Sequence, residues 1–138
     1  MNSRKSALLN YRPIISSAIV SSNTSDGERF QNETLRPIIK FQNDLFIAVF
    51  TNYIKKYKSV FYNLSLEKKM DYIENAIQKN IKFRNSLKGM IIGQFTVDEY
   101  ENYIINSSSL NKRMMSIVIE RLKDQVQLFE KSENRIAV

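Results

Sequence analysis

Apolar residues recur every three or four positions along most of this chain, a spacing that places them on one face of an α-helix. Only three glycines and two prolines interrupt the pattern, so the turn signals that β-hairpins need are scarce. The pattern therefore predicts an all-α protein, built as a compact bundle of five or six helices. At 138 residues the chain fits one domain with a core of its own.

The longest apolar pattern covers residues 38–57 and predicts the central, most buried helix. One stripe there consists of Ile38, Phe41, Leu45, Val49 and Tyr53, and it is widened by Phe46, Phe50, Ile54 and Tyr57. Pro37 has no amide hydrogen and disfavours helix in the residue before it. We therefore expect either a kink near residue 36 or a helix that restarts with Pro37 in its first turn.

Capping residues predict where the other helices begin. Ser25 with Glu28, and Thr96 with Glu99, have the spacing of a capping box. A single N-cap is expected at Ser65, before LEKKMDYIENAIQK, and another at Asn80, before a helix that ends near Gly93.

The second capping box also predicts a hydrophobic staple between Phe95 and Tyr100. After a short helix to about Ile105, the polar run NSSS predicts a break, and a last helix follows to about Glu130.

The two ends of the chain differ in composition from the middle. Residues 1–24 are rich in serine and asparagine and predict a flexible N-terminal arm, with a short helix beginning at Pro13. Residues 25–131 form the single predicted helical domain, and residues 132–138 form a tail that we expect to fray.

The absence of cysteine and histidine removes much of the usual catalytic and metal-binding chemistry. Residues 88–99 have the glycine and glutamate spacing of an EF-hand loop but lack its first oxygen ligands. Ser65 and Lys68 match an S-x-x-K pair, although the motifs that would complete that site are missing. No catalytic residue, metal ligand or cofactor is predicted.

The first residues are basic and then apolar, but NYRP at 10–13 interrupts the apolar run before it reaches the length of a signal peptide core. The run LFIAVF at 45–50 is far shorter than the roughly 20 residues of a membrane-spanning helix. We therefore expect a cytoplasmic protein with no membrane segment.

The chain carries a net charge of +7, which favours anionic partners. Two runs are free of acidic residues, and the first interleaves lysines with Tyr53 and Tyr57. Lysines neutralise phosphates and tyrosines stack on bases, so one interpretation of the runs is a nucleic-acid-binding surface. Its candidate residues are Lys55, Lys56, Lys58, Lys82, Arg84 and Lys88. The interpretation we prefer is that these residues form ordinary solvated helix faces and a lysine-rich helix end.

Two spacings suggest helix association. Met115, Leu122 and Phe129 lie seven residues apart on the last predicted helix, so they are candidates for self-association and for a homo-oligomer. Gly89 and Gly93 have the spacing that allows close packing against another helix, either within the chain or in a dimer.

Four runs, LRPIIKFQNDL, KKMDYIENAIQK, FRNSLKGMIIGQFTVDEY and SSSLNKRMM, carry a resemblance. Through them the chain, from Leu35 to Phe129, resembles a group of small uncharacterised all-helical bacterial proteins, some of them labelled glyoxalase. That label implies βαβββ modules around a divalent metal. This sequence has neither the histidines nor the strand pattern for such modules, so the resemblance transfers no catalytic residue.

Three functional classes follow, in order of preference. The first is a non-catalytic helical interaction or accessory protein that binds a protein partner or a second copy of itself. The second is a basic nucleic-acid-binding protein that uses the lysine and tyrosine surface. The third is an enzyme of unidentified type.

Overall fold

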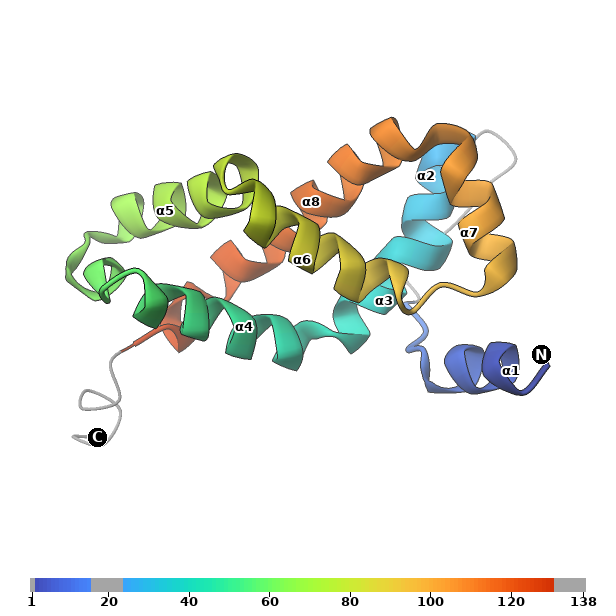
Figure 1. The fold of residues 1–138 in the computed structure, drawn as a ribbon, viewed down its shortest axis with the longest axis horizontal. Helices are drawn as coiled ribbons and strands as arrows, with labels where there is room; N and C mark the ends of the chain where they lie inside the picture. Colours follow the sequence, from blue (N-terminus) through green and yellow to red (C-terminus); the bar gives the residue numbers. More distant parts are fainter. Residues whose placement is uncertain (1, 16–23, 131–138) are drawn as a thin grey trace.

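The fold is all-α, as predicted, and no strand occurs in residues 2–15 and 24–130, which the computed structural model describes (Figure 1). The α-helices are α1 (Asn2–Tyr11), α2 (Asp26–Phe30), α3 (Arg36–Phe41), α4 (Asn43–Lys56), α5 (Leu66–Lys79), α6 (Ile81–Ile92), α7 (Val97–Tyr103) and α8 (Ser107–Asp124). A π-helical turn, η1 (Gln31–Leu35), and three 3₁₀ turns, η2 (Val60–Asn63), η3 (Ile104–Asn106) and η4 (Val126–Leu128), connect them.

Pro37 lies inside a continuous helical run rather than at a break. The segments α2, η1 and α3 follow one another without interruption from Asp26 to Phe41. The amide of Arg36 donates to the carbonyl of Gln31, five residues back, which is the wide turn of a π-helix. With 26–41 counted as one helix, six helices follow the N-terminal arm in the described residues, within the predicted number.

The predicted helix over 38–57 is divided by a turn at Gln42, where α3 ends and α4 begins. Phe41 at the end of α3 and Leu45 in the first turn of α4 are exposed on either side of this turn, although they were predicted to lie in the buried stripe. The buried face of α4 consists of Phe46, Phe50 and Ile54. Reading the segment as one unbroken helix therefore gave the wrong principal face.

Helix α8 shares the centre of the molecule with α4. It packs against α5, α6, α3 and η1, and its buried residues are Leu110, Met114, Met115, Val118, Ile119 and Leu122. Phe129, just beyond it, packs edge-on against Phe50 with ring centres 4.9 Å apart. The core thus joins the last helix to the aromatic face of α4.

The three candidate residues for self-association lie inside this core. Met115, Leu122 and Phe129 are all buried within the protomer. They hold the chain together and do not form an exposed face for a second copy, because each is already covered by its own chain. Self-association stays a prediction, but it requires a surface other than this one.

The predicted helix caps at Ser25, Ser65, Asn80 and Thr96 are confirmed, although only the Ser25 half of the capping box predicted with Glu28 is formed. The side chains of Ser25, Ser65 and Asn80 accept hydrogen bonds from backbone amides three residues on, at 3.2, 3.3 and 3.1 Å. The capping box at Thr96 is complete, since Glu99 Oε1 accepts from the Thr96 amide and Thr96 Oγ1 accepts from the Glu99 amide.

Two predictions about the end of the chain are wrong. Phe95 packs edge-on against Phe30 and Tyr103, both at 5.5 Å, while Tyr100, its predicted staple partner, is exposed. The predicted break falls only on Asn106, whose φ of −143° and ψ of 45° are not helical, because Ser107–Ser109 already belong to α8. Helix α8 ends at Asp124 rather than near Glu130, so the predicted end of the last helix is wrong.

The N-terminal arm contains a helix before Pro13, and Pro13–Ile15 are not helical. This helix, α1, covers Asn2–Tyr11, and the prediction of a helix beginning at Pro13 is wrong over Pro13–Ile15. Residues 16–23 of the arm and the tail 132–138 lie outside the described residues. The flexibility of the arm stays a prediction.

The glycine pair of α6 does not mark a close helix contact within the chain. A Cβ on Gly89 would meet nothing within 4 Å, and one on Gly93 would meet only the carbonyl oxygen of Gly89, at 3.1 Å. The intramolecular form of the close-packing prediction is therefore wrong, and the dimer alternative stays untested.

Candidate functional site

The six predicted basic residues do not form one surface. Lys82 lies on the same face of α6 as Ser86, and both line a hollow against α4 that also includes Lys56. Arg84 and Lys88 line a different hollow, against α8. Two residues along an α-helix are about 200° apart around the axis, so Lys82 and Arg84 lie on opposite faces.

Lys55 and Lys58 are exposed near the end of α4 and line neither hollow.

Two adjoining hollows, of about 730 and 600 Å³, share Tyr53, Tyr57, Asn80 and Lys82, and together we call them the tyrosine groove. The groove lies where the end of α4 meets the corner between α5 and α6. Its other lining residues are Ala48, Val49, Asn52, Lys56, Val60, Tyr72, Asn75, Ala76, Lys79, Ile81, Phe83, Ser86 and Met90. No carboxylate occurs in this lining.

Asn80 is the centre of the groove and the start of α6. Its Oδ1 accepts from the amide of Phe83, which caps the helix. Its Nδ2 donates to the hydroxyls of Tyr57, at 3.0 Å, and Tyr53, at 3.4 Å. One side chain therefore both begins α6 and holds two tyrosine rings that come from α4.

The tyrosine rings form a layered aromatic wall. The ring of Tyr53 lies 4.5 Å from that of Tyr57 and 4.3 Å from that of Phe83, at tilted angles. Tyr57 is 43% exposed, so its ring is the part of the wall that a ligand can reach. Burial, and to a lesser extent the neighbouring Tyr53 and Tyr57, raises the pKa of Tyr72 above its ordinary value of 10.0.

The turn that follows α4 is locally strained. Lys58 and Ser59 have φ values of 66° and 58°, in the left-handed region that residues other than glycine enter at a cost of roughly 1 kcal/mol each. The turn carries the chain from Tyr57 into η2, where Val60 lines the groove. Strain of this kind is common at functional sites, and here it borders the exposed tyrosine.

The lining chemistry suits binding rather than bond-making. Lys56, Lys79 and Lys82 supply positive charge, and no histidine or carboxylate is present in the lining to act as a general base. Lysine ammonium groups and tyrosine hydroxyls donate hydrogen bonds to anions, while an exposed ring offers a face for stacking. The groove therefore fits a ligand that is both anionic and partly flat or apolar.

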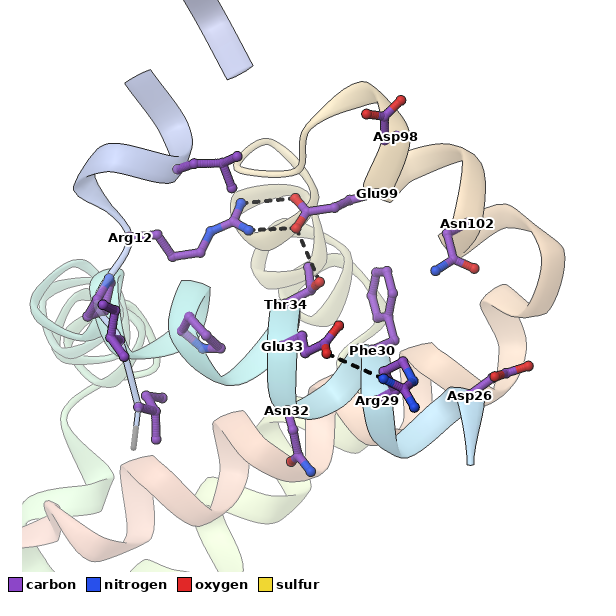
Figure 2. Close-up of a pocket in the computed structure, with 15 residues that line it drawn as sticks. Arg12, Asp26, Arg29, Phe30, Asn32, Glu33, Thr34, Asp98, Glu99 and Asn102 are labelled. Carbon is purple, nitrogen blue, oxygen red and sulfur yellow. Dashed lines mark hydrogen bonds and ion pairs between the residues drawn. The ribbon is translucent and has the colours of Figure 1, made fainter. Parts of the chain in front are cut away.

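A third hollow, of about 780 Å³, lies where the N-terminal arm meets α7 and η1, and its lining mixes charged with apolar side chains (Figure 2). Arg12 donates to both carboxylate oxygens of Glu99, at 2.6 and 3.0 Å, and to the carbonyl of Gln94. Thr34 donates to the same carboxylate at 3.2 Å. The Arg12 and Glu99 side chains are only 8% and 18% exposed.

The Glu99 carboxylate is fully occupied by these bonds and by the Thr96 amide. Burial alone would raise its pKa, but the hydrogen bonds from Arg12, Thr96 and Thr34 together with the Arg12 charge outweigh that effect and hold the pKa below 4.5. A carboxylate with every acceptor position in use has none left for a substrate. We therefore interpret the Arg12–Glu99 pair as an anchor for the arm rather than an active site.

Two surface contacts extend the anchor along α1. Arg4 donates to the carbonyl of Gly93 at 3.1 Å, and Lys5 pairs with Asp98 at 2.9 Å. Figure 1 shows α1 beside the corner that joins α6 to α7. This site could not be predicted from local sequence patterns, because its partners are 82–93 residues apart.

The remaining sequence motifs have structural roles. Ser65 accepts the Lys68 amide as an N-cap, which accounts for the S-x-x-K pair. Within the described ranges, no group of three or more acidic side chains could hold a metal ion. None of the helices described is both long and apolar enough to cross a membrane, and the cytoplasmic location stays a prediction.

Comparisons with protein-family models, curated proteins and solved structures found no match to this chain. The resemblance to small helical bacterial proteins therefore stays a prediction. The function proposed below rests on the geometry of the chain itself.

Proposed function

We propose that this protein is a non-catalytic binding protein that uses the tyrosine groove to hold an acidic segment of a protein partner. The observation that supports this most strongly is the lining of the groove, which combines three lysines with tyrosine hydroxyls and contains no carboxylate. A chain of net charge +7 also attracts acidic partners over a distance before contact.

The apolar part of the groove favours a peptide over a simple anion. Ile81 and Val60 are 66% and 52% exposed beside the tyrosine wall, and large apolar side chains of this kind are suited to contact with a partner. An acidic segment with an aromatic or aliphatic side chain would place its carboxylates near Lys56 and Lys82 and its apolar group against Tyr57.

Single-stranded nucleic acid is the second candidate ligand, favoured by the exposed ring of Tyr57 between lysines. Bases stack on tyrosine, and lysines contact the phosphates. The separation of Arg84 and Lys88 from this groove reduces the basic surface available to nucleic acid. Only part of the predicted set remains on one side of α6.

Binding of two labelled probes, an acidic peptide of about ten residues with one phenylalanine and a single-stranded oligonucleotide of about ten nucleotides, separates the candidates. We expect the peptide to bind at physiological salt. The double variant Lys56→Glu/Lys82→Glu should lower the affinity for the peptide at least tenfold, about 1.4 kcal/mol. Tighter groove-dependent binding of the oligonucleotide, with an affinity that falls steeply with salt, would favour the second candidate.

Lys40→Glu is the matched control, because Lys40 is exposed on α3 and lines no hollow of the groove. If Lys40→Glu weakens binding as much per reversed charge as the groove variants do, net charge alone drives the association. That result, or no binding of either probe, contradicts the proposal.

A further inference from the structure

We propose a second binding site, independent of the tyrosine groove, for a small phosphate-bearing molecule between α6 and α8. The two helices pack against each other, and a hollow of about 530 Å³ lies along their contact. Small-molecule sites typically have volumes of roughly 300–1,000 Å³. We call it the α6–α8 hollow, and its lining residues are Gln78, Arg84, Lys88, Ser108, Asn111, Lys112, Met115, Ser116 and Ile119.

The charge of this hollow is all of one sign. Arg84 and Lys88 lie one helical turn apart on α6, and Lys112 comes from α8. Among residues 2–15 and 24–130, no carboxylate forms an ion pair with any of the three. Cations that line one hollow without a counter-charge repel each other, so a bound anion would stabilise the fold.

Neutral hydrogen-bond donors complete the lining. Ser108 and Ser116 lie one turn to either side of Lys112 on the same face of α8. Asn111 Oδ1 already accepts a hydrogen bond of 2.6 Å from the Tyr103 hydroxyl, which leaves the amide nitrogen as the donor of that side chain. Guanidinium, ammonium, hydroxyl and amide donors are the groups that bind phosphate oxygens in proteins.

An apolar floor sets the size and nature of the ligand. Met115 and Ile119 line the hollow and belong to the core. A phosphate ion would make no use of these apolar side chains, whereas the apolar body of a phosphate ester could pack against the small parts of them that line the hollow. We therefore assign the α6–α8 hollow to a small organic phosphate ester, and expect an ester to bind more tightly than inorganic phosphate.

The test compares inorganic phosphate and phenyl phosphate as probes, at constant ionic strength against chloride. Both should raise the melting temperature of the full-length protein, with phenyl phosphate binding at least about fivefold more tightly in calorimetry. Lys112→Gln and Arg84→Gln should each lower the affinity for both probes about tenfold or more. Lys112 is exposed, so its variant should fold even if replacement of the half-buried Arg84 disturbs α6.

Lys40→Gln supplies the control for loss of one positive charge, and Lys82→Gln supplies the control for the tyrosine groove. Both should keep wild-type affinity for the probes. Equal weakening in all four variants would mean that phosphate only screens the net charge, and it would overturn the site. Absence of saturable binding would overturn the site as well. So would protection of Lys112 from chemical modification by an oligonucleotide but by neither phosphate probe.

Discussion

The buried carboxylate of Glu99 connects three parts of the chain through its hydrogen bonds. It closes the capping box of α7, accepts two hydrogen bonds from Arg12, and accepts a third from the buried Thr34. Because Arg12 and Glu99 are largely removed from water, replacing either one leaves the other charge without its partner.

Glu99→Gln should therefore lower the free energy of unfolding by about 2 kcal/mol, since it removes the charge while keeping the shape of the side chain. Glu101→Gln, an exposed change in the same helix, should alter it by less than about 0.5 kcal/mol. Urea denaturation of both variants measures the difference. Equal effects would show that the Arg12–Glu99 pair does not stabilise the fold.

The same carboxylate predicts a pH dependence. Its pKa is lowered in the folded protein, so the ionised form is favoured by folding. This contribution is fully present above the ordinary pKa of 4.5 and is lost as pH falls through the folded-state pKa. The stability difference between wild type and Glu99→Gln should thus be constant near neutrality and shrink below pH 4.5, in urea titrations at several pH values.

Local signals made part of the Glu99 site predictable. The spacing of Thr96 and Glu99 was enough to predict the capping box, because both partners lie within one turn. The bond from Arg12 was not predictable, because nothing near residue 12 indicates a partner 87 residues away. Hydrophobic spacing also gave no sign that Arg12 would be buried, since an arginine does not contribute to an apolar pattern.

At the scale of helices, α6 contains a glycine that no contact requires. A Cβ at Gly89 would meet nothing within 4 Å, and glycine in a helix interior is less favourable than alanine by roughly 0.5–1 kcal/mol. Gly89→Ala should therefore raise the free energy of unfolding by about that amount. Gly93→Ala, whose Cβ would meet the Gly89 carbonyl at 3.1 Å, should gain less in the same denaturation experiment. A destabilised Gly89→Ala would point to the untested dimer contact.

Two substitutions at Asn80 separate its role as the cap of α6 from its hydrogen bonds to the tyrosine hydroxyls. Asn80→Ala removes the cap of α6 and both tyrosine hydrogen bonds, so stability should fall by about 1–2 kcal/mol. Asn80→Asp keeps a good capping oxygen and should cost much less. Thermal melts compare the two variants, and an equal loss in both would mean that the tyrosine contacts, not the cap, determine stability here.

Helix starts were predictable because capping is a local interaction. The division at Gln42 was not, because the apolar pattern continues across it and neither glycine nor proline marks the turn. Tertiary contacts accompany that turn, since the Gln42 side chain donates to the carbonyl of Met90 at 3.0 Å. The same kind of long-range packing buries Met115, Leu122 and Phe129, whose spacing alone resembled a seam for a second copy.

At the scale of the whole molecule, the packing of α6 between two neighbours divides the basic residues. Lys82 faces the tyrosine groove beside α4, and Arg84 faces the hollow beside α8. Charge counting predicted an anionic partner but could not divide the lysines between surfaces, since that division depends on which helices flank α6. The two anion-binding proposals follow from this arrangement, and each has its own variants.

The most direct test of the tyrosine groove is NMR titration of the isotope-labelled protein with the acidic phenylalanine peptide, for wild type and Asn80→Asp. We expect the largest shifts at Tyr57, Asn80 and Lys82, and their loss in Asn80→Asp, whose added carboxylate repels the peptide while the fold is kept. Shifts centred elsewhere, or unchanged binding by Asn80→Asp, would contradict the groove as the working surface of this protein.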